Sequence, residues 1–268
     1  MPASDPAPGH AADRALLERA ARAAGEIALS FTGDALDVRY KAADGSPVTA
    51  ADLAVNARLE ELLRSAQPDY GWLSEESVDN AARRAAERVF IVDPIDGTRS
   101  FIAGEDTWAH SLAVAENGVI TAAAIYLPKR DLLYSAALGQ GAVLNGVPLR
   151  TTLTGTLDDA EVLAPRPVMD SPFWRVPLPP IRRAHRPSLA YRLGLVAEGR
   201  FDAMLTFRPT WEWDIAAGTL LLQEAGARVT DRLGRPLRFN ARHPQHPGVV
   251  AANPALHADI MGRLTLAL

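Results

Sequence analysis

The chain contains no cysteine among its 268 residues. This absence excludes disulfide bonds, thiolate zinc sites and cysteine nucleophiles. It also fits a reducing compartment, where structural disulfides are rare. Residues 1–10 are rich in proline and alanine, and they have neither the basic start nor the apolar core of a secretion signal. We therefore expect a soluble, cytoplasmic protein.

Long apolar runs are missing as well. No uninterrupted apolar stretch approaches the roughly 20 residues that a membrane helix needs, so we expect no integral membrane segment. Lysine occurs only at Lys41 and Lys129, and the net charge is −4 with a sequence pI of about 5.9. No overall positive field therefore attracts a nucleic-acid polymer or an anionic membrane. The arginines of region 175–192 could still form a local positive patch.

The residues that are present favour a mixed fold. Hydrophobic residues make up 48% of the chain, which is enough for one large domain or two small ones. Tight turns are predicted at Glu116-Asn117-Gly118 and at Asn145-Gly146. Paired antiparallel strands dominate the first half, and strands alternate with helices in the second. We expect an α/β protein with an N-terminal α+β domain at 1–146 and a C-terminal α/β domain at 147–268.

Apolar spacing and turn residues divide the chain into elements. The proline-rich region 168–187 is predicted to be an exposed loop. Helices are predicted at 13–31, 49–65, 189–198, 215–225 and 254–266. Strands are predicted at 71–73, 89–92, 108–115, 119–126, 132–137, 141–144, 203–207 and 249–251.

The most informative stretch is 89–101. A four-residue apolar run predicts a buried strand, which leads into Asp93 and Asp96 on either side of Pro94. Because proline biases the residue before it towards an extended backbone, both carboxylates can converge just past the strand end. Two carboxylates that close repel each other unless a cation neutralises them, and hard oxygen ligands suit Mg²⁺ better than zinc. The alternative is a plain acidic turn after a strand.

Other acidic residues outside charge runs could face the same site. Glu75 and Glu76 follow an apolar Trp-Leu pair, although a helix start with Ser74 as its N-cap would explain them equally well. Asp214 stands at the start of a predicted helix whose first turn is small and apolar, and simple capping is its alternative. Asp52 completes a Thr-x-x-Asp pattern that is typical of a capping box.

The glycine and threonine after the aspartates add a second kind of chemistry. A helix that starts at Gly97-Thr98 would aim backbone N–H groups and its dipole at an anion. The Thr98 hydroxyl could orient a water. Clustered carboxylates for Mg²⁺ beside an anion-binding helix start indicate metal-assisted phosphoryl transfer to water.

These residues, in this order, resemble the signature of the inositol monophosphatase superfamily of lithium-sensitive phosphomonoesterases. That signature is an early Asp, then Glu-Glu, then Asp-Pro-Ile-Asp-Gly-Thr, then Trp-Asp followed by Ala-Gly. The resemblance runs from about Asp13 to past Asp231 and implies a layered αβαβα sandwich. The chain supplies Asp52, Glu75-Glu76, Asp93-Pro94-Ile95-Asp96-Gly97-Thr98 and Trp213-Asp214-Ile215-Ala216-Ala217-Gly218.

The resemblance also implies roles for individual residues. Two or three Mg²⁺ ions would be bound by Glu75, Asp93, the Ile95 carbonyl, Asp96 and Asp214. Asp93 would bridge two of them. The attacking water would be activated by Asp52, Glu75 and Thr98, and it would attack the phosphorus in line with the leaving group. The substrate and its phosphate would be held by Asp96, Gly97, Thr98, Arg192 and Asp214.

The substrate branch follows from the segment Pro209-Thr210-Trp211-Glu212-Trp213-Asp214. It resembles the 3'(2'),5'-bisphosphate nucleotidase branch, which also has a basic residue on the preceding helix, where Arg192 falls. The inositol branch typically has a sugar-binding Glu about seven residues before the aspartate, whereas this chain has Thr206-Phe207-Arg208. A bisphosphate needs a second cationic contact, which could come from Arg192, Arg183, Arg186 or Arg208 unless these arginines are simply solvated.

We therefore expect hydrolysis of 3'-phosphoadenosine 5'-phosphate to AMP and phosphate. The alternative is an inositol-1-monophosphatase or another sugar-phosphate or histidinol-phosphate phosphatase. A regulatory binding protein that keeps the fold is the hypothesis from a different class. The expected partner is a small phosphorylated substrate, either a nucleotide bisphosphate or a sugar phosphate, and the chain would be a monomer or a homodimer.

Overall fold

The computed structural model describes residues 8–42, 45–158 and 160–265. In this part of the chain, a seven-stranded sheet has the order β3-β4-β5-β6-β7-β8-β9. β3 and β4 pair in parallel, and each later neighbour pairs antiparallel. The strands are β3 (Gly71–Ser74), β4 (Arg88–Asp96), β5 (Ala109–Glu116), β6 (Val119–Leu127), β7 (Leu132–Ala137), β8 (Ala142–Leu144) and β9 (Val147–Pro148).

A five-stranded sheet has the order β11-β10-β12-β16-β14. Its strands are β10 (Glu161–Leu163), β11 (Arg182–Ala184), β12 (Ala203–Thr206), β14 (Arg228–Thr230) and β16 (Val249–Ala252). Two short strand pairs complete the β structure, β1 (Arg39–Tyr40) with β2 (Pro47–Val48) and β13 (Thr210–Trp211) with β15 (Gln245–His246).

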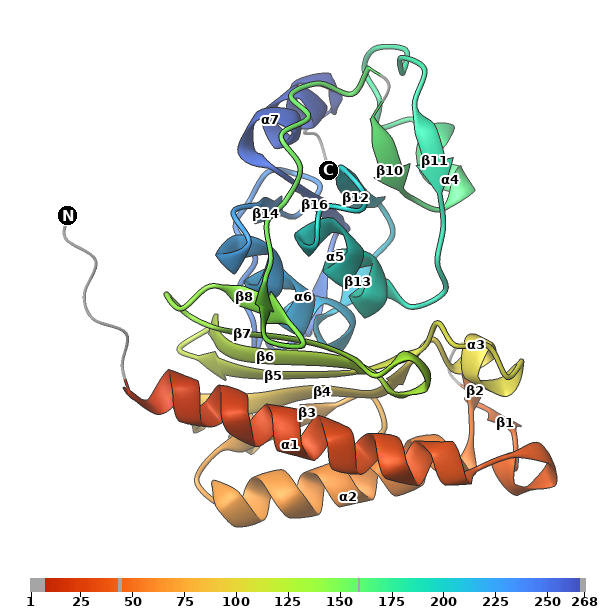
Figure 1. The fold of residues 1–268 in the computed structure, drawn as a ribbon, viewed down its shortest axis with the longest axis vertical. Coiled ribbons are helices and arrows are strands. Elements are labelled where there is room, and N and C mark those ends of the chain that lie inside the picture. The colour runs from red at the N-terminus through yellow and green to blue at the C-terminus, as the bar shows by residue number, and fades with distance from the viewer. Residues whose placement is uncertain (1–7, 43–44, 159, 266–268) are drawn as a thin grey trace.

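Together, the two sheets and the helices that cover them form five layers (Figure 1). α1 and α2 cover one face of the seven-stranded sheet, and α5 and α6 lie between that sheet and the five-stranded one, with α7 beyond it. This arrangement is the expected αβαβα sandwich. The helices are α1 (Pro8–Ser30), α2 (Ala50–Ala66), α3 (Thr98–Ile102), α4 (Arg166–Met169), α5 (Leu189–Ala197), α6 (Glu212–Glu224) and α7 (Pro254–Arg263).

The central strands are apolar on both faces because helices cover both. Along β5, Leu112 and Val114 face the α1 and α2 layer, whereas Ala113 and Ala115 belong to the core that includes α5 and α6. Side chains alternate between the faces of a strand, so each face is filled by every second residue. The small alanines allow the helices to approach the sheet closely.

The close crossing of α5 and α6 depends on one glycine. A Cβ atom built on Gly218 of α6 would lie 2.3 Å from Cδ1 and 2.5 Å from Cβ of Leu193 on α5. No real side chain tolerates such distances. Gly218 therefore permits the helix contact that brings the first turns of α5 and α6 to the same end of the sheet.

Most predicted elements are confirmed, including both tight turns, where Asn117, Gly118, Asn145 and Gly146 all have positive φ. The prediction of a plain loop at 168–187 is wrong in part: the end of α4 and the edge strand β11 lie there, because Arg182–Ala184 pairs with β10. The proposed boundary after residue 146 stays a prediction, and the first sheet continues to Pro148.

Several element ends also differ from the prediction. α6 begins at Glu212 instead of 215, and α7 ends at Arg263, before the predicted end at 266. β4 runs on through Asp96, so the aspartates lie within its last residues instead of just beyond it. None of the helices in the described ranges combines the length and the apolar character that crossing a bilayer requires.

We expect Gly218→Ala to destabilise the protein by about 1–3 kcal/mol, because the added methyl group must displace the stem of Leu193. The matched control is Gly262→Ala on α7, where a Cβ meets nothing within 4 Å. This substitution should instead stabilise by up to about 1 kcal/mol through helix propensity. Urea unfolding of both variants measures the difference, and equal free energies of unfolding would contradict the packing argument.

Candidate active site

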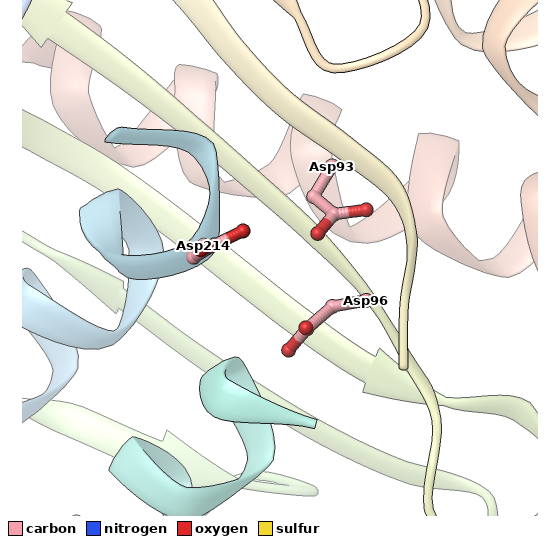
Figure 2. A group of neighbouring side chains, drawn as sticks. All are labelled: Asp93, Asp96 and Asp214. Atoms are coloured by element: carbon pink, nitrogen blue, oxygen red, sulfur yellow. The ribbon is translucent and has the colours of Figure 1, made fainter. Parts of the chain in front are cut away.

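Three aspartates from two distant stretches of the chain meet at one point. Asp93 and Asp96 lie near the end of β4, and Asp214 lies in the first turn of α6 (Figure 2). One carboxylate oxygen from each lies within 4.8 Å of the others. Asp93 is 1% exposed and Asp96 is 8% exposed, whereas Asp214 is half-buried. The alternative of a plain acidic turn is wrong, since the strand buries both of its carboxylates.

A bulge in β4 places its two aspartates. Asp93 pairs with Ser111 and Asp96 with Ala109, so that two residues of β4 oppose the single residue His110. Pro94 has no N–H to give to the ladder, but its carbonyl accepts a hydrogen bond from Nδ1 of the buried His110. Burial lowers the pKa of His110 to about 4, so its ring is neutral at neutral pH. The hydrogen bond from His110 to the bulge therefore adds no positive charge beside the aspartates.

The start of α5 holds Asp96 in place. Oδ2 of Asp96 accepts hydrogen bonds of 2.6 Å from the Ser188 hydroxyl and of 2.6 Å from the Ala190 backbone N–H. Ser188 is also the N-cap of α5, where its oxygen accepts from the Tyr191 N–H. A carboxylate at a helix N-terminus is favoured by the helix dipole.

The first turn of α6 is fixed on several sides. The Glu212 carboxylate, which is fully buried, accepts from the backbone N–H groups of Asn240 at 2.6 Å and Ala241 at 3.0 Å. The Ser111 hydroxyl donates to the Trp213 carbonyl at 3.0 Å. Asp214 is the third residue of the helix, and its carboxylate accepts a hydrogen bond from the backbone N–H of the N-cap residue Trp211, so the capping alternative is present in addition to its approach to Asp93 and Asp96.

Glu75 is not among the three carboxylates that meet within 4.8 Å, but its charge acts on all three of them. It stands in a turn after β3, so its alternative as part of a helix start is wrong. Its carboxylate accepts a hydrogen bond of 2.8 Å from Lys41, which also binds Glu76 at 2.7 Å. Burial and the charge of Lys41 oppose each other at Glu76, and burial prevails, raising its pKa to about 7. The metal-binding role of Glu75 stays a prediction.

Asp52 and Thr98 lie beside the carboxylates. Asp52 forms the predicted capping box with Thr49 at the start of α2. The Thr98 hydroxyl lies 3.5 Å from Oδ1 of Asp52 and 3.2 Å from the Ile95 carbonyl. Gly97, with φ of +96°, is the N-cap of α3, so the expected helix start at Gly97-Thr98 is confirmed. The catalytic roles of these residues are untested.

A cavity of about 740 Å³ opens in front of these groups. One side of it is polar and includes Glu75, Asp96, Gly97 and Thr98. The other side comes from the C-terminal half of the chain. There the lining includes Phe173, His185, Arg192, Phe207 and Arg208.

The arginines of the cavity differ in their freedom to bind a ligand. Arg192 is 7% exposed and donates to the carbonyls of Arg186 and Pro187 and to His185. Burial lowers the pKa of Arg192 to about 10, so it stays charged at neutral pH. Arg208 is exposed at the cavity wall. Of the other arginines considered from the sequence, Arg183 and Arg186 are not among the lining residues.

Sequence reasoning missed several residues that support the site. These residues act through partners that are far away in the sequence, so no local pattern marks them. Only Ser188, which has a typical N-cap side chain before a predicted helix, carried a usable signal. They are Lys41, His110, Ser111, Ser188 and Glu212.

The order and geometry of these carboxylates can be compared with known proteins. Residues 12–265 match the family model described as "Inositol monophosphatase family". The chain belongs to the inositol monophosphatase family. It is therefore a phosphatase, a phosphoric monoester hydrolase, as the sequence predicts.

Several named proteins resemble most of the chain. A Nus factor SuhB of Pseudomonas aeruginosa is 34% identical over 231 residues, covering 81% of this chain and 84% of that protein. An inositol-1-monophosphatase of Rhizobium meliloti is 36% identical over 197 residues, covering 70% and 73%. The crystal structure of the extragenic suppressor protein suhB from Bartonella henselae has a TM-score of 0.80 and 28% identity, covering 96% and 100%. These names support the family and not the bisphosphate nucleotidase branch.

The electrostatics of the site fit the divalent cation that this family generally uses. Burial, followed by the charges of Glu75, Asp96 and Asp214, raises the pKa of Asp93 well above its usual value. Burial, then Asp96 and Glu75, does the same to Asp214. Oδ1 of Asp93 is buried and accepts no hydrogen bond within the described part of the chain. Three repelling carboxylates with an unsatisfied oxygen form a site that could hold a metal ion.

We expect the metal-free protein to lose stability as the pH rises. The pKa of Asp96 is raised by burial from 3.8 to about 6, and Asp93 and Asp214 shift in the same direction. The folded state therefore holds these protons more tightly than the unfolded chain. Their stabilising contribution is complete at a pH below the pKa that these carboxyls have in the unfolded chain. It is lost as the pH rises through the higher pKa that they have in the folded protein.

Thermal unfolding in EDTA between about pH 4 and pH 7 measures this effect. Asp214→Asn should flatten the decline, because it removes one of the interacting charges, and Mg²⁺ should restore the wild type at neutral pH. Parallel pH profiles for the wild type and the variant would show that the carboxylates do not interact as described.

Proposed function

We propose that this chain hydrolyses small phosphate monoesters with Mg²⁺ held by Asp93, Asp96 and Asp214. The observation that carries the proposal is that these three carboxylates, two of them buried and one half-buried, have oxygens within 4.8 Å of one another. Glu75 and the Ile95 carbonyl are the further ligands proposed for two or three ions. Bound there, Mg²⁺ supplies Lewis-acid stabilisation of the charge that develops on the phosphoryl oxygens.

The protein's own groups orient the attacking water. The Thr98 hydroxyl can donate to either Asp52 or the Ile95 carbonyl and still accept a hydrogen bond from a water. Burial raises the pKa of Asp52 to about 6 against the hydrogen bonds from Thr49. Asp52 is therefore ionised at neutral pH and has a pKa suited to receiving a proton. The backbone N–H groups of Gly97 and Thr98 are proposed to hold the phosphate.

The cavity favours a substrate with an aromatic part and a second anionic group. Phe207 occupies the position where the inositol branch typically has its sugar-binding Glu, and its ring centroid lies 6.0 Å from that of Phe173. Two half-buried rings suit a nucleobase better than a polyol. Arg208 could pair with a second phosphate. We therefore propose 3'-phosphoadenosine 5'-phosphate as the substrate, with AMP and phosphate as products.

Two other functions are supported by particular observations. The name of the Rhizobium meliloti relative favours inositol 1-phosphate as the alternative substrate. The name Nus factor, carried by the Pseudomonas aeruginosa relative, favours a regulatory binding role. A binding role would survive an Asp93→Asn substitution that abolishes turnover.

We expect Asp93→Asn to lower kcat by several orders of magnitude, because it removes the charge at the centre of the proposed metal site. This loss should exceed the roughly 10–100-fold effect of altering outer-shell partners. Asp106→Asn is the matched control, since Asp106 is exposed and forms an ion pair with Arg130. Phosphate release with Mg²⁺ and circular dichroism are the measurements. Turnover close to that of the control would refute the role of Asp93.

We expect kcat/KM to be higher for 3'-phosphoadenosine 5'-phosphate than for inositol 1-phosphate. Arg208→Gln should lower the nucleotide value by about 10–100-fold, the usual size of a charge-assisted hydrogen bond, and affect inositol 1-phosphate less. Arg182→Gln, at an exposed arginine on β11 outside the cavity lining, should change neither value. A preference for the sugar phosphate would overturn the substrate proposal and leave the phosphatase proposal intact.

A further inference from the structure

β5 carries two consecutive polar side chains that lie on opposite faces of the seven-stranded sheet. The His110 ring packs against Trp108 and Tyr126, with centroid distances of 5.5 Å and 6.5 Å. Ser111 reaches the other face, where its hydroxyl donates to the Trp213 carbonyl at 3.0 Å. His110 is 0% exposed and Ser111 is 1% exposed. Both side chains bind the carbonyl of a residue that directly adjoins an aspartate of the site.

We propose that His110 and Ser111 are a pair of positioning residues that fixes the Asp93–Asp96 bulge relative to Asp214 and so sets the affinity for the divalent cation. The inference rests on the proposed metal-dependent function. It assigns a role to two side chains that are not among the residues lining the cavity and that bind backbone carbonyls beside the carboxylates.

The His110 part of the argument comes from the bulge. A bulged strand has one residue without a ladder partner, and Pro94 cannot donate a hydrogen bond at all. The Pro94 carbonyl can only accept, so Nδ1 of His110 carries the hydrogen. Its other nitrogen, Nε2, is buried and has no hydrogen-bond partner among the residues that the structure describes. A polar ring with one unsatisfied nitrogen is retained here for the single bond that it makes to the bulge.

The Ser111 part of the argument comes from the register. Ser111 is the ladder partner of Asp93. Its side chain binds the carbonyl of Trp213, the residue before Asp214. One connection between the two halves of the site therefore runs from Asp93 across one strand pair to Ser111, and from there through one hydrogen bond to the first turn of α6.

A small cation demands tight geometry, and this explains why the connection matters. Mg²⁺ accepts little departure from octahedral coordination. If the bulge or the helix turn shifts, the three carboxylates relax away from one another to reduce their repulsion, and the bound geometry must then be rebuilt at the expense of affinity. Outer-shell partners of metal ligands typically contribute about 10–100-fold in affinity.

The test is a calorimetric titration of the metal-free full-length protein with Mn²⁺, without substrate. Ser111→Ala and His110→Val should each weaken binding by about tenfold or more. Ser111→Thr and His110→Asn keep a donor at each position and should recover most of the affinity. Thr121→Val is the matched control, because Thr121 is buried in β6 of the same sheet and its hydroxyl binds the Val114 carbonyl, away from the site.

A second readout separates positioning from general damage. In phosphatase assays, the two weakened variants should need more Mg²⁺ for half-maximal rate and regain most of the wild-type kcat at saturation. Their melting temperatures in EDTA should shift no more than that of Thr121→Val. If His110→Val does not fold, the comparison of Ser111→Ala with Ser111→Thr decides alone.

Each outcome bears on a definite claim. Wild-type protein that binds Mn²⁺, together with variants of unchanged affinity, would overturn the positioning pair and leave the proposed function standing. Equal losses in the Thr121→Val control would also overturn it. Wild-type protein that binds no Mn²⁺ at all would instead overturn the metal-dependent function, and the positioning role with it.

Discussion

Repulsion between buried carboxylates is the constraint on which the rest of this structure depends. Asp93 and Asp96 are buried, Asp214 is half-buried, and oxygens of the three lie within 4.8 Å of one another. Burial and like charge act together and raise the pKa of each carboxyl. Such a cluster weakens the fold in isolation, and a divalent cation bound there would offset the repulsion. On the proposed function, that ion would be the one that the hydrolysis uses.

The surrounding elements hold this unfavourable cluster together. Asp96 is attached to the start of α5 by Ser188 and Ala190. The first turn of α6 is attached to the loop at Asn240 and Ala241 through the buried carboxylate of Glu212. The close α5–α6 crossing at Gly218 then fixes one helix start relative to the other. The packed apolar layers make the fold rigid, and these few hydrogen bonds fix the positions of the Asp96 and Asp214 carboxylates.

The sequence predicts the parts of the fold and the site that are local. The Asp-Pro-Ile-Asp-Gly-Thr motif is contiguous, so its strand, its two carboxylates and its helix start could be predicted together. The edge strand β11 was missed because its pairing with β10 is not encoded in region 168–187 itself. The partners of Lys41, His110 and Ser188 lie 34, 16 and 92 residues away in the sequence. Such contacts arise only from the folded topology, which a single sequence does not display.

The central claim is that the three aspartates form one divalent-cation site. It is tested most directly by a crystal structure of the protein grown with Mn²⁺, with anomalous scattering recorded at the manganese absorption edge. The account predicts at least one anomalous peak within bonding distance of oxygens from Asp93, Asp96 and Asp214. Peaks confined to other parts of the molecule, with these three carboxylates free of manganese, would contradict it.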